Sequence, residues 1–275
     1  MRFSIELAPE LIDANVLTDI DSVNVQILPA SYYTIEQASP VIIPAGSING
    51  RIPIQLEDAF FEDTLSFGDF GDVHYVIPLR ITDFQDLDSL LTGIPAVDNP
   101  IKIREADWNP APKDYTLFGL KFMNKYQAKY LRRGEDVATN NLGEIITSTY
   151  RSEFVVRDEL IDLTTSGRFN VSYTNRARRG DLPGGGDVEM ELSFNSDDTC
   201  TISGLGDDPF GVSGTGQFVE DGDEWGGERR DVIYLDYQFT DAVNNETHAV
   251  KDTLVVRNRD VKFEQFTVEL TEVTP

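Results

Sequence analysis

Short runs of alternating apolar and polar residues, closed by proline or glycine, constrain the fold of this chain more than any other feature. Residues 3–7 (FSIEL) alternate up to Pro9, residues 52–56 (IPIQL) repeat the pattern, and residues 73–81 (VHYVIPLRI) form a longer apolar run. A period of two residues is typical of half-buried strands. Strands at this spacing predict a β-sandwich in the first part of the chain.

The remainder of the chain shows the same kind of pattern and predicts a second β-domain. We expect strands at residues 116–124, 145–150, 152–156, 167–174, 187–194, 199–204, 211–220, 231–240, 248–257 and 263–270. Turn sequences lie at residues 195–198, 221–222 and 244–245. Sequential antiparallel strands joined by short turns favour a meander that closes into a barrel.

A proline-containing segment separates the two predicted domains. Residues 108–114 (WNPAPKD) hold two prolines and are typical of a stiff linker. The pattern therefore predicts a β-sandwich at residues 1–107, a linker at 108–114 and a barrel at 115–275.

An excess of acidic residues excludes several classes of partner. The chain has 48 Asp and Glu against 23 Lys and Arg, a formal net charge of −25. Nucleic-acid binding needs a basic face, and adsorption to anionic membranes needs basic clusters. We expect most of this charge to solvate an exposed surface, with calcium binding as the alternative.

Cysteine usage and hydropathy give further limits. Cys200 is the one cysteine, so no internal disulfide can form, and its strand context predicts a small buried side chain. No window holds the roughly 20 apolar residues of a membrane-spanning helix. The first strand pattern begins directly after Met1, so we expect a targeting segment to have been removed.

Motifs in both parts of the chain are similar to known sequences. Residues 27–34 (ILPASYYT) and 41–46 (VIIPAG), followed by 75–79 (YVIPL), resemble the immunoglobulin-like domain at the N-terminus of many Bacteroidetes lipoproteins. The same module precedes the catalytic barrel of certain family-18 endo-β-N-acetylglucosaminidases.

The second part of the chain resembles the C-terminal partner domain of these two-domain surface lipoproteins. Residues 118–126 (FGLKFMNKY), 130–134 (YLRRG) and 250–259 (VKDTLVVRNR) carry the resemblance. It implies an all-β protein: an N-terminal immunoglobulin-like β-sandwich followed by an antiparallel lipocalin-like β-barrel. It also implies an outer-membrane lipoprotein at the cell surface, encoded near glycan-uptake machinery, whose signal peptide and lipid-anchoring cysteine were removed.

The resemblance brings no catalytic residues with it, since much of the family has no known function. One departure is visible: Gln127-Ala128 stand where relatives commonly have His-Gly. This departure weakens the expectation of a shared ligand contact at that point.

The usual catalytic patterns are missing from the sequence. The only histidines, His74 and His248, lie in strand patterns of different predicted domains, which favours structural roles over a zinc site or a Ser-His-Asp triad. A glycosidase needs only two carboxylates, but no DxxDxDxE-like run is present. We expect no enzyme activity and no cofactor.

Aromatic residues with polar neighbours are candidate sugar contacts, because a ring face packs on sugar C–H groups while polar groups bond the hydroxyls. Trp225 lies in a polar, glycine-rich segment with Asp223 and Arg229, and Trp108 lies in the linker. A third, basic cluster comprises Tyr126 and Tyr130 with Lys125, Arg132 and Arg133. The alternatives are that Trp225 plugs a barrel end, Trp108 cements the domain interface, and the basic cluster pairs with the acidic surface.

Asp221 and Asp223 are candidate calcium ligands, since DGDE offers several oxygens in one turn. The segment lacks the DxDxDG…E spacing of a calcium loop, so a solvated turn remains the alternative.

Together these features predict a non-catalytic, cell-surface glycan-binding accessory lipoprotein of a polysaccharide or host-glycan utilisation system. Its expected partners are a glycan or outer-membrane glycan-uptake proteins, with no nucleic acid, and with membrane contact only through the lipid anchor. One alternative is a structural or protein-interaction module of an outer-membrane complex, with a packed barrel. Another is an apolar ligand inside the barrel, beside Phe169, Phe194, Phe218 and Phe239.

Overall fold

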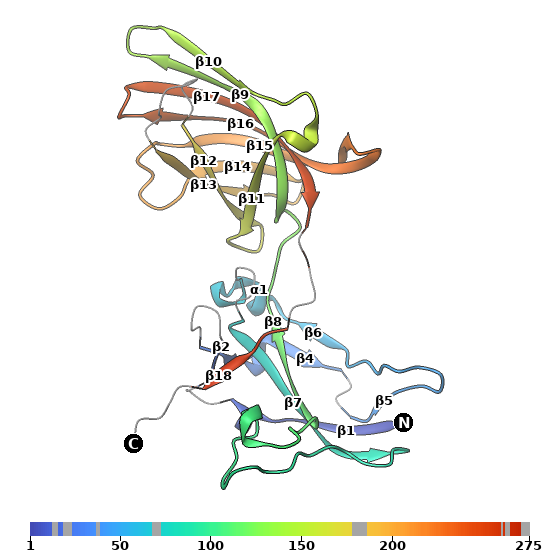
Figure 1. Cartoon of the computed structure of the whole chain (residues 1–275). Coiled ribbons are helices and arrows are strands. Elements are labelled where there is room, and N and C mark those ends of the chain that lie inside the picture. Colours follow the sequence, from blue (N-terminus) through green and yellow to red (C-terminus); the bar gives the residue numbers. More distant parts are fainter. Residues whose placement is uncertain are drawn as a thin grey trace. The chain divides into compact units, whose positions relative to one another are not determined.

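The computed structural model describes residues 1–12, 16–18, 24–36, 39–67, 73–177, 186–259, 261 and 265–270. Its regular elements are mostly strands, as the sequence predicts, and it forms two compact units (Figure 1). Unit 1 comprises residues 1–122 and 263–275, and unit 2 comprises residues 123–262. In the described part of the chain, no helix has the length and apolar character needed to cross a membrane.

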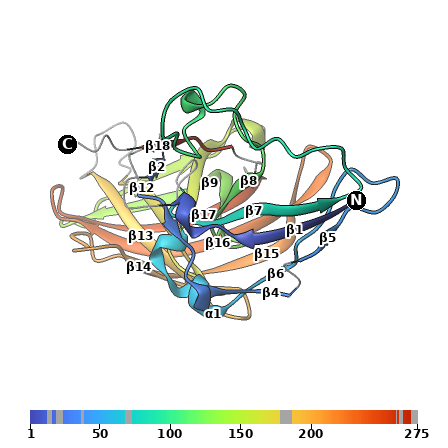
Figure 2. The same cartoon turned by 90° about the horizontal axis from the view of Figure 1, so that it is seen from below.

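Unit 1 contains a five-stranded sheet organised around one long strand. β7 (Tyr75–Gln85) pairs with β1 (Arg2–Leu7), β8 (Tyr115–Leu120) and, in parallel, β3 (Gln26–Ile27). β5 (Val41–Ile42) extends the sheet beyond β1, and Figure 2 shows β1 between β7 and β5. Because β7 carries the apolar run, its side chains hold the sheet against the core.

A smaller pair of strands packs on this sheet. β4 (Tyr33–Ile35) and β6 (Ile54–Leu56) pair with each other, and α1 (Asp58–Glu62) follows β6. Their apolar side chains join those of β7 in one core, as expected for a sandwich of two layers. A second apolar cluster lies beside β2 (Val16–Thr18), which pairs with β18 (Val268–Leu270).

Among the described residues, five single-turn 3₁₀ segments connect the strands. They are η1 (Pro9–Leu11), η2 (Ala30–Tyr32), η3 (Thr64–Ser66), η4 (Glu105–Asp107) and η5 (Val155–Arg157).

Unit 2 is a closed, eight-stranded antiparallel barrel. Its strands, in order around the barrel, are β9 (Ala128–Asn140), β11 (Glu159–Thr165), β12 (Asn170–Arg176), β13 (Asp187–Phe194), β14 (Thr199–Gly204), β15 (Ser213–Trp225), β16 (Glu228–Asp241) and β17 (Glu246–Asn258). β17 pairs with β9 over almost its whole length, which closes the barrel and leaves no free edge between them. β10 (Ile145–Tyr150) pairs with the second half of β9.

The barrel interior is filled by side chains that alternate inward along each strand. Tyr126 stacks on Phe194 with ring centroids 3.6 Å apart at one end of an apolar cluster. Cys200 is buried in the same cluster, as predicted, and burial raises the pKa of its thiol to about 12. Polar residues interrupt this core on β9 and β17, where buried Arg132, Asp252 and His248 point inward.

The compact units divide elsewhere than at the predicted linker. Residues 108–114 lie inside unit 1, where Trp108 bridges to Pro95, and β8 then pairs with β7. Of the strand predicted at 263–270, residues 268–270 form β18 of unit 1, and residues 263–264 lie outside the described residues. Pairing between segments far apart in sequence sets these limits, so the prolines of 108–114 mark a bend within a unit.

Two local predictions for the barrel need correction. The turn expected at 221–222 is a bulge inside β15, where the register shifts between Val219 and Asp223. The hairpin turns instead at Gly226-Gly227, whose positive φ angles of 67° and 78° suit a tight turn. The strand expected at 152–156 is absent, because η5 occupies Val155–Arg157.

Candidate functional site

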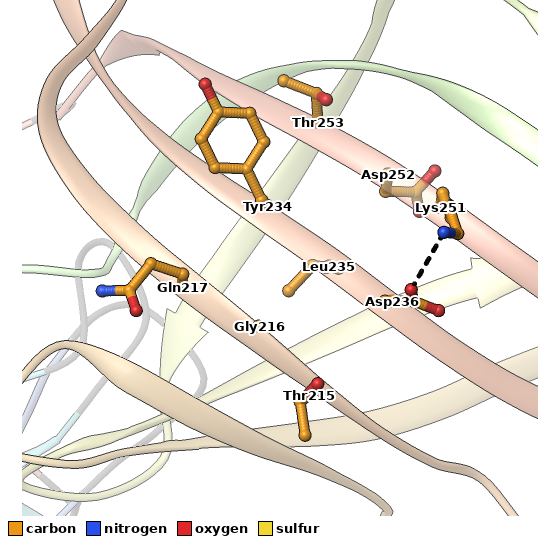
Figure 3. Close-up of a pocket in the computed structure, with 9 residues that line it drawn as sticks. All are labelled: Thr215, Gly216, Gln217, Tyr234, Leu235, Asp236, Lys251, Asp252 and Thr253. Carbon is orange, nitrogen blue, oxygen red and sulfur yellow. Dashed lines mark ion pairs between the residues drawn. The ribbon is translucent and has the colours of Figure 1, made fainter.

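A shallow hollow of about 410 Å³ lies on the face of β15, β16 and β17 that points away from the barrel interior (Figure 3). Two rows of three side chains line it, each row running across the three strands in register. The rows are Gln217–Tyr234–Thr253 and Thr215–Asp236–Lys251. Alternation places these side chains outward, because the residues between them pack into the barrel core.

The floor between the rows is formed by Gly216, Leu235 and Asp252. A Cβ at position 216 would meet Cys200 Sγ and Leu235 Cδ2 at 2.7 Å. Glycine therefore lets β15 lie directly over these core side chains.

Tyr234 is the aromatic residue of the hollow, with 42% of its surface exposed. Its hydroxyl donates to the backbone oxygen of Gly222 in the β15 bulge, at 3.4 Å. Figure 3 shows the Tyr234 ring on one side of Leu235 and the Asp236–Lys251 pair on the other. The ring offers an apolar face beside groups that can form hydrogen bonds, which is the combination that sugar sites use.

The ion pair in the second row is open to solvent. Lys251 Nζ lies 3.2 Å from Asp236 Oδ2, and the two side chains are 78% and 65% exposed. An exposed pair contributes little to stability, but it holds one donor and one acceptor ready for a ligand.

A buried polar cluster lies beneath the floor and joins Tyr237 of β16 and Asp252 of β17 to side chains of β9, β10 and β12. Arg132 Nε donates to Asp252 Oδ2 at 2.9 Å, and its Nη1 donates to Asn175 Oδ1 at 2.5 Å. Asn175 donates to the Tyr237 hydroxyl at 2.6 Å, which in turn donates to Asp252 at 3.1 Å. The Tyr150 hydroxyl donates to the other oxygen of Asp252.

Burial keeps the tyrosines of this cluster neutral. It raises the pKa of Tyr150 well above the ordinary value, and the nearby Asp252 carboxylate adds to the effect. Burial also raises the pKa of Tyr237. Both hydroxyls therefore remain hydrogen-bond donors to Asp252 at physiological pH.

The basic and aromatic cluster predicted as a ligand site lies mostly inside the barrel. Tyr126, Tyr130 and Arg132 are each no more than 2% exposed. The Tyr126 hydroxyl donates to Asp198 at 2.8 Å, the Tyr130 hydroxyl to the Tyr126 backbone oxygen at 2.6 Å, and Arg133 Nε to Asp158 at 2.6 Å. These contacts are of the intramolecular kind that the alternative interpretation expected.

The structure brings Trp225, Asp223 and Arg229 together at the tip of the β15–β16 hairpin. Trp225 is half-buried, and the guanidinium of Arg230 lies 5.0 Å from its ring centroid. Arg229 donates to the backbone oxygen of Asp221 at 2.6 and 2.9 Å. This tip is separate from the hollow, which lies further along the same two strands.

The remaining predicted residues lie apart from these. Trp108 belongs to unit 1, where its Nε1 donates to the backbone oxygen of Ile101 at 2.9 Å. Asp221 and Asp223 belong to no group of three potential metal ligands within the described ranges. One such group occurs there, formed by Asp241, Glu246 and His248.

A second hollow, of about 430 Å³, opens between β11 and β12. These strands pair only at Thr164–Ser172 and Thr165–Val171, so they separate toward Glu159 and Arg176. Its lining is mostly polar and includes Glu159, Asp162 and Asn175, but it has no aromatic ring.

Sequence reasoning missed Tyr234, Asp236 and Lys251. Alternation along the YLDYQ segment marks Tyr234 and Asp236 as outward-facing, which was the available signal. That Lys251 and Thr253 lie beside them depends on the pairing register, which no single strand reveals.

Comparisons with known proteins agree with this division into two domains. A family model for a domain of unknown function (DUF5627) matches residues 125–260, and an N-terminal domain model matches residues 2–88. Comparison with curated proteins gives no match. A crystal structure from Bacteroides thetaiotaomicron, of an auxiliary nutrient binding protein, is 15% identical with a TM-score of 0.37. It covers 93% of this chain and 83% of that one, and a likeness at this level carries no inference.

A crystal structure from Bacteroides ovatus, described as a structural-genomics protein of unknown function, is far more similar. It is 33% identical with a TM-score of 0.86, and the match covers 98% of this chain and 84% of that one. Identity at this level over both domains shows common ancestry. The chain is therefore a member of the same family of two-domain proteins of unknown function as this Bacteroides ovatus protein.

Proposed function

We propose that this protein is a non-catalytic glycan-binding accessory protein of a polysaccharide or host-glycan utilisation system. The hollow on β15, β16 and β17 is its binding site. The observation that carries the proposal is the exposed Tyr234 ring, held between polar side chains on three strands in fixed register. Rigid strands present such a platform without an ordering cost on binding.

The chemistry of the hollow favours binding over hydrolysis. Its exposed carboxylate is Asp236, whereas Asp252 points inward to Arg132. Glycoside hydrolysis generally uses two carboxyl groups facing the same bond. A ring beside a single carboxylate and an amine suits recognition of hydroxyl groups.

The packed barrel argues against the apolar-ligand alternative. Phe194, Phe218 and Phe239 are 6% exposed or less and belong to one core, whereas Phe169 is 53% exposed. The four rings therefore do not surround a common space.

The proposed location is the cell surface, on the outer membrane, through a lipid anchor. Support comes from the resemblance of the N-terminal motifs to Bacteroidetes lipoproteins. At that location the protein would act beside outer-membrane glycan-uptake proteins.

A panel of plant and host oligosaccharides, screened by thermal shift and then by calorimetry, tests the proposal. Tyr234→Ala should weaken binding of the active glycan about tenfold or more, because a stacked ring contributes about 0.5–1.5 kcal/mol beyond its buried area. Tyr234→Phe should keep most of the affinity. Phe169→Ala, which removes another exposed barrel ring, is the matched control and should change nothing.

Three results would count against this assignment. Loss of affinity in Trp225→Ala but not in Tyr234→Ala would move the site to the hairpin tip. Native affinity in both variants would place the binding site elsewhere. A folded protein that binds no glycan would favour the protein-interaction alternative.

A further inference from the structure

A buried group of nitrogen and oxygen ligands lies at the end of the β16–β17 hairpin. We propose that Asp241, Glu246 and His248 form a binding site for a divalent transition metal ion of the zinc type. The three side chains are 0%, 2% and 1% exposed, and one potential ligand atom from each lies within 4.8 Å of the others. This site is independent of the glycan hollow.

Strand pairing places the three residues together. Asp241 and Glu246 are direct partners across β16 and β17, and His248 follows Glu246 two residues later on the same face. All three point into the barrel, as the alternating burial of both strands shows. The ligand atoms are thus held by paired strands directly beside the hairpin turn.

His248 is oriented as a metal-binding histidine is. Its Nδ1 lies 2.8 and 3.0 Å from the two oxygens of Asp136, and its ring stacks on Phe239 with centroids 4.4 Å apart. A carboxylate on Nδ1 keeps the proton there and leaves the lone pair on Nε2. Within the described part of the chain, Nε2 has no hydrogen-bond partner although it is fully buried.

The distances fit a shared ion better than a hydrogen bond. His248 Nε2 lies 3.9 Å from Glu246 Oε2, too far for a hydrogen bond. Two ligands of a tetrahedral zinc ion, each about 2.1 Å from it, lie about 3.4 Å apart. A small side-chain movement would bring both atoms to an ion between them.

Hydrogen bonds also hold the Asp241 carboxylate in place for metal binding. Its Oδ1 accepts the backbone N–H groups of Val243 and Asn244 at 3.0 and 3.3 Å, and its Oδ2 accepts the Asn244 amide at 2.8 Å. Ligating carboxylates are commonly fixed by such hydrogen bonds.

The ligand types identify the class of ion. An imidazole with two carboxylates suits zinc, whereas calcium prefers six to eight oxygens and rarely uses nitrogen. Three protein ligands leave one position for water or another small ligand.

Calorimetric titration of the chelator-treated full chain with Zn²⁺ tests the proposal. We expect saturable binding of one ion per chain, and Co²⁺ bound in its place should give visible absorption bands. Asp241→Asn keeps an oxygen that can accept from the backbone N–H groups of Val243 and Asn244 and loses only the bond from the Asn244 side chain. It should therefore fold, and it should abolish both signals. Glu246→Gln should do the same.

The matched control is Asp221→Asn combined with Asp223→Asn on the hairpin tip, which should bind Zn²⁺ like the native chain. Far-ultraviolet circular dichroism establishes that each variant is folded. Absence of saturable binding in the native chain would overturn the proposal. So would unchanged binding in both Asp241→Asn and Glu246→Gln, or loss of binding only in the hairpin-tip control.

Discussion

Two polar clusters share the inner face of β17, only four residues apart, and they are completed in different ways. At Asp252, the carboxylate meets an arginine and two tyrosine hydroxyls. At His248, Asp136 binds one ring nitrogen and the other nitrogen has no hydrogen bond within the described residues. A buried polar group without a partner is costly, so the first cluster is built for stability and the second for a ligand.

The comparison also separates two uses of a buried carboxylate. Asp252 balances the charge of Arg132, at 2.9 Å, within the protein itself. Asp136 instead fixes the direction and tautomer of an imidazole. Removing a group from the first cluster should affect folding, whereas removing one from the second should affect metal binding.

Arg132→Met should cause the largest loss of stability. It leaves Asp252 buried without its cation, which costs about 3–5 kcal/mol in comparable pairs. Urea unfolding measures this loss of stability, which should be the same in the presence and in the absence of Zn²⁺. The double variant Arg132→Met with Asp252→Leu should regain much of the loss, because it removes the unpaired charge. No regain would mean that the cluster acts through packing and not through charge.

Gly134→Ala should have the next largest effect. A Cβ there would meet Asp252 Oδ1 and the Lys251 backbone oxygen at 2.3 Å, and Tyr150 at 3.0 Å. Overpacking of this kind costs about 1–3 kcal/mol. Gly143→Ala, also on the β9–β10 hairpin, is a useful comparison because its Cβ would meet nothing within 4 Å. Its positive φ of 78° would add backbone strain but no clash, so Gly134→Ala should be the more destabilising.

The buried charges of these two clusters explain which strands could be predicted from the sequence. Residues 145–150, 187–194 and 199–204 are strands with the predicted bounds. In 187–194 and 199–204 the apolar residues alternate cleanly with polar ones. β9 was missed because its inward positions include Arg132, Gly134 and Asp136. Charges that point inward remove the apolar period on which strand prediction depends.

The candidate sites were less predictable than the fold. Trp225, Asp223 and Arg229 do share a hairpin tip, because they are close in sequence. The hollow and the His248 group each draw on adjacent strands at one register, and Asp136 lies 112 residues from His248. A lone histidine in a strand favoured a structural role, and only the pairing of β9 with β17 reveals its carboxylate partner.

Asp136→Asn should separate stability from metal binding. The amide oxygen can still accept from His248 Nδ1, so the loss of stability should be about 1 kcal/mol. Affinity for Zn²⁺ should fall about 10–100-fold, as it does when outer partners of metal ligands are changed. Parallel urea unfolding and calorimetry provide both numbers. A loss of stability with unchanged affinity for Zn²⁺ would indicate that Asp136 has only a structural role.

The smallest effect is expected at Asp198, which provides a surface counterpart to both buried clusters. Lys125, with Nζ 2.6 Å from its carboxylate, holds the pKa of Asp198 below the ordinary value, and the Tyr126 hydroxyl helps. Because the folded pKa is lowered, this stabilisation is present above the unfolded pKa and disappears as the pH falls through the folded one.

Asp198→Asn should therefore lower the free energy of unfolding by about 0.2–1 kcal/mol at pH 7, since the pair is partly exposed. Asparagine tolerates the positive φ of 64° at this turn, so backbone strain is not a competing cause. The difference from the native chain should disappear as the pH falls below about 3.9, the ordinary value for an aspartate. Unfolding curves at several pH values measure it. A difference that stays constant with pH would assign the effect to the packing of this turn instead of the charge, because the asparagine oxygen can still accept from the Tyr126 hydroxyl. The surface pair would then differ from the Asp252 cluster, whose stability we expect to depend on charge.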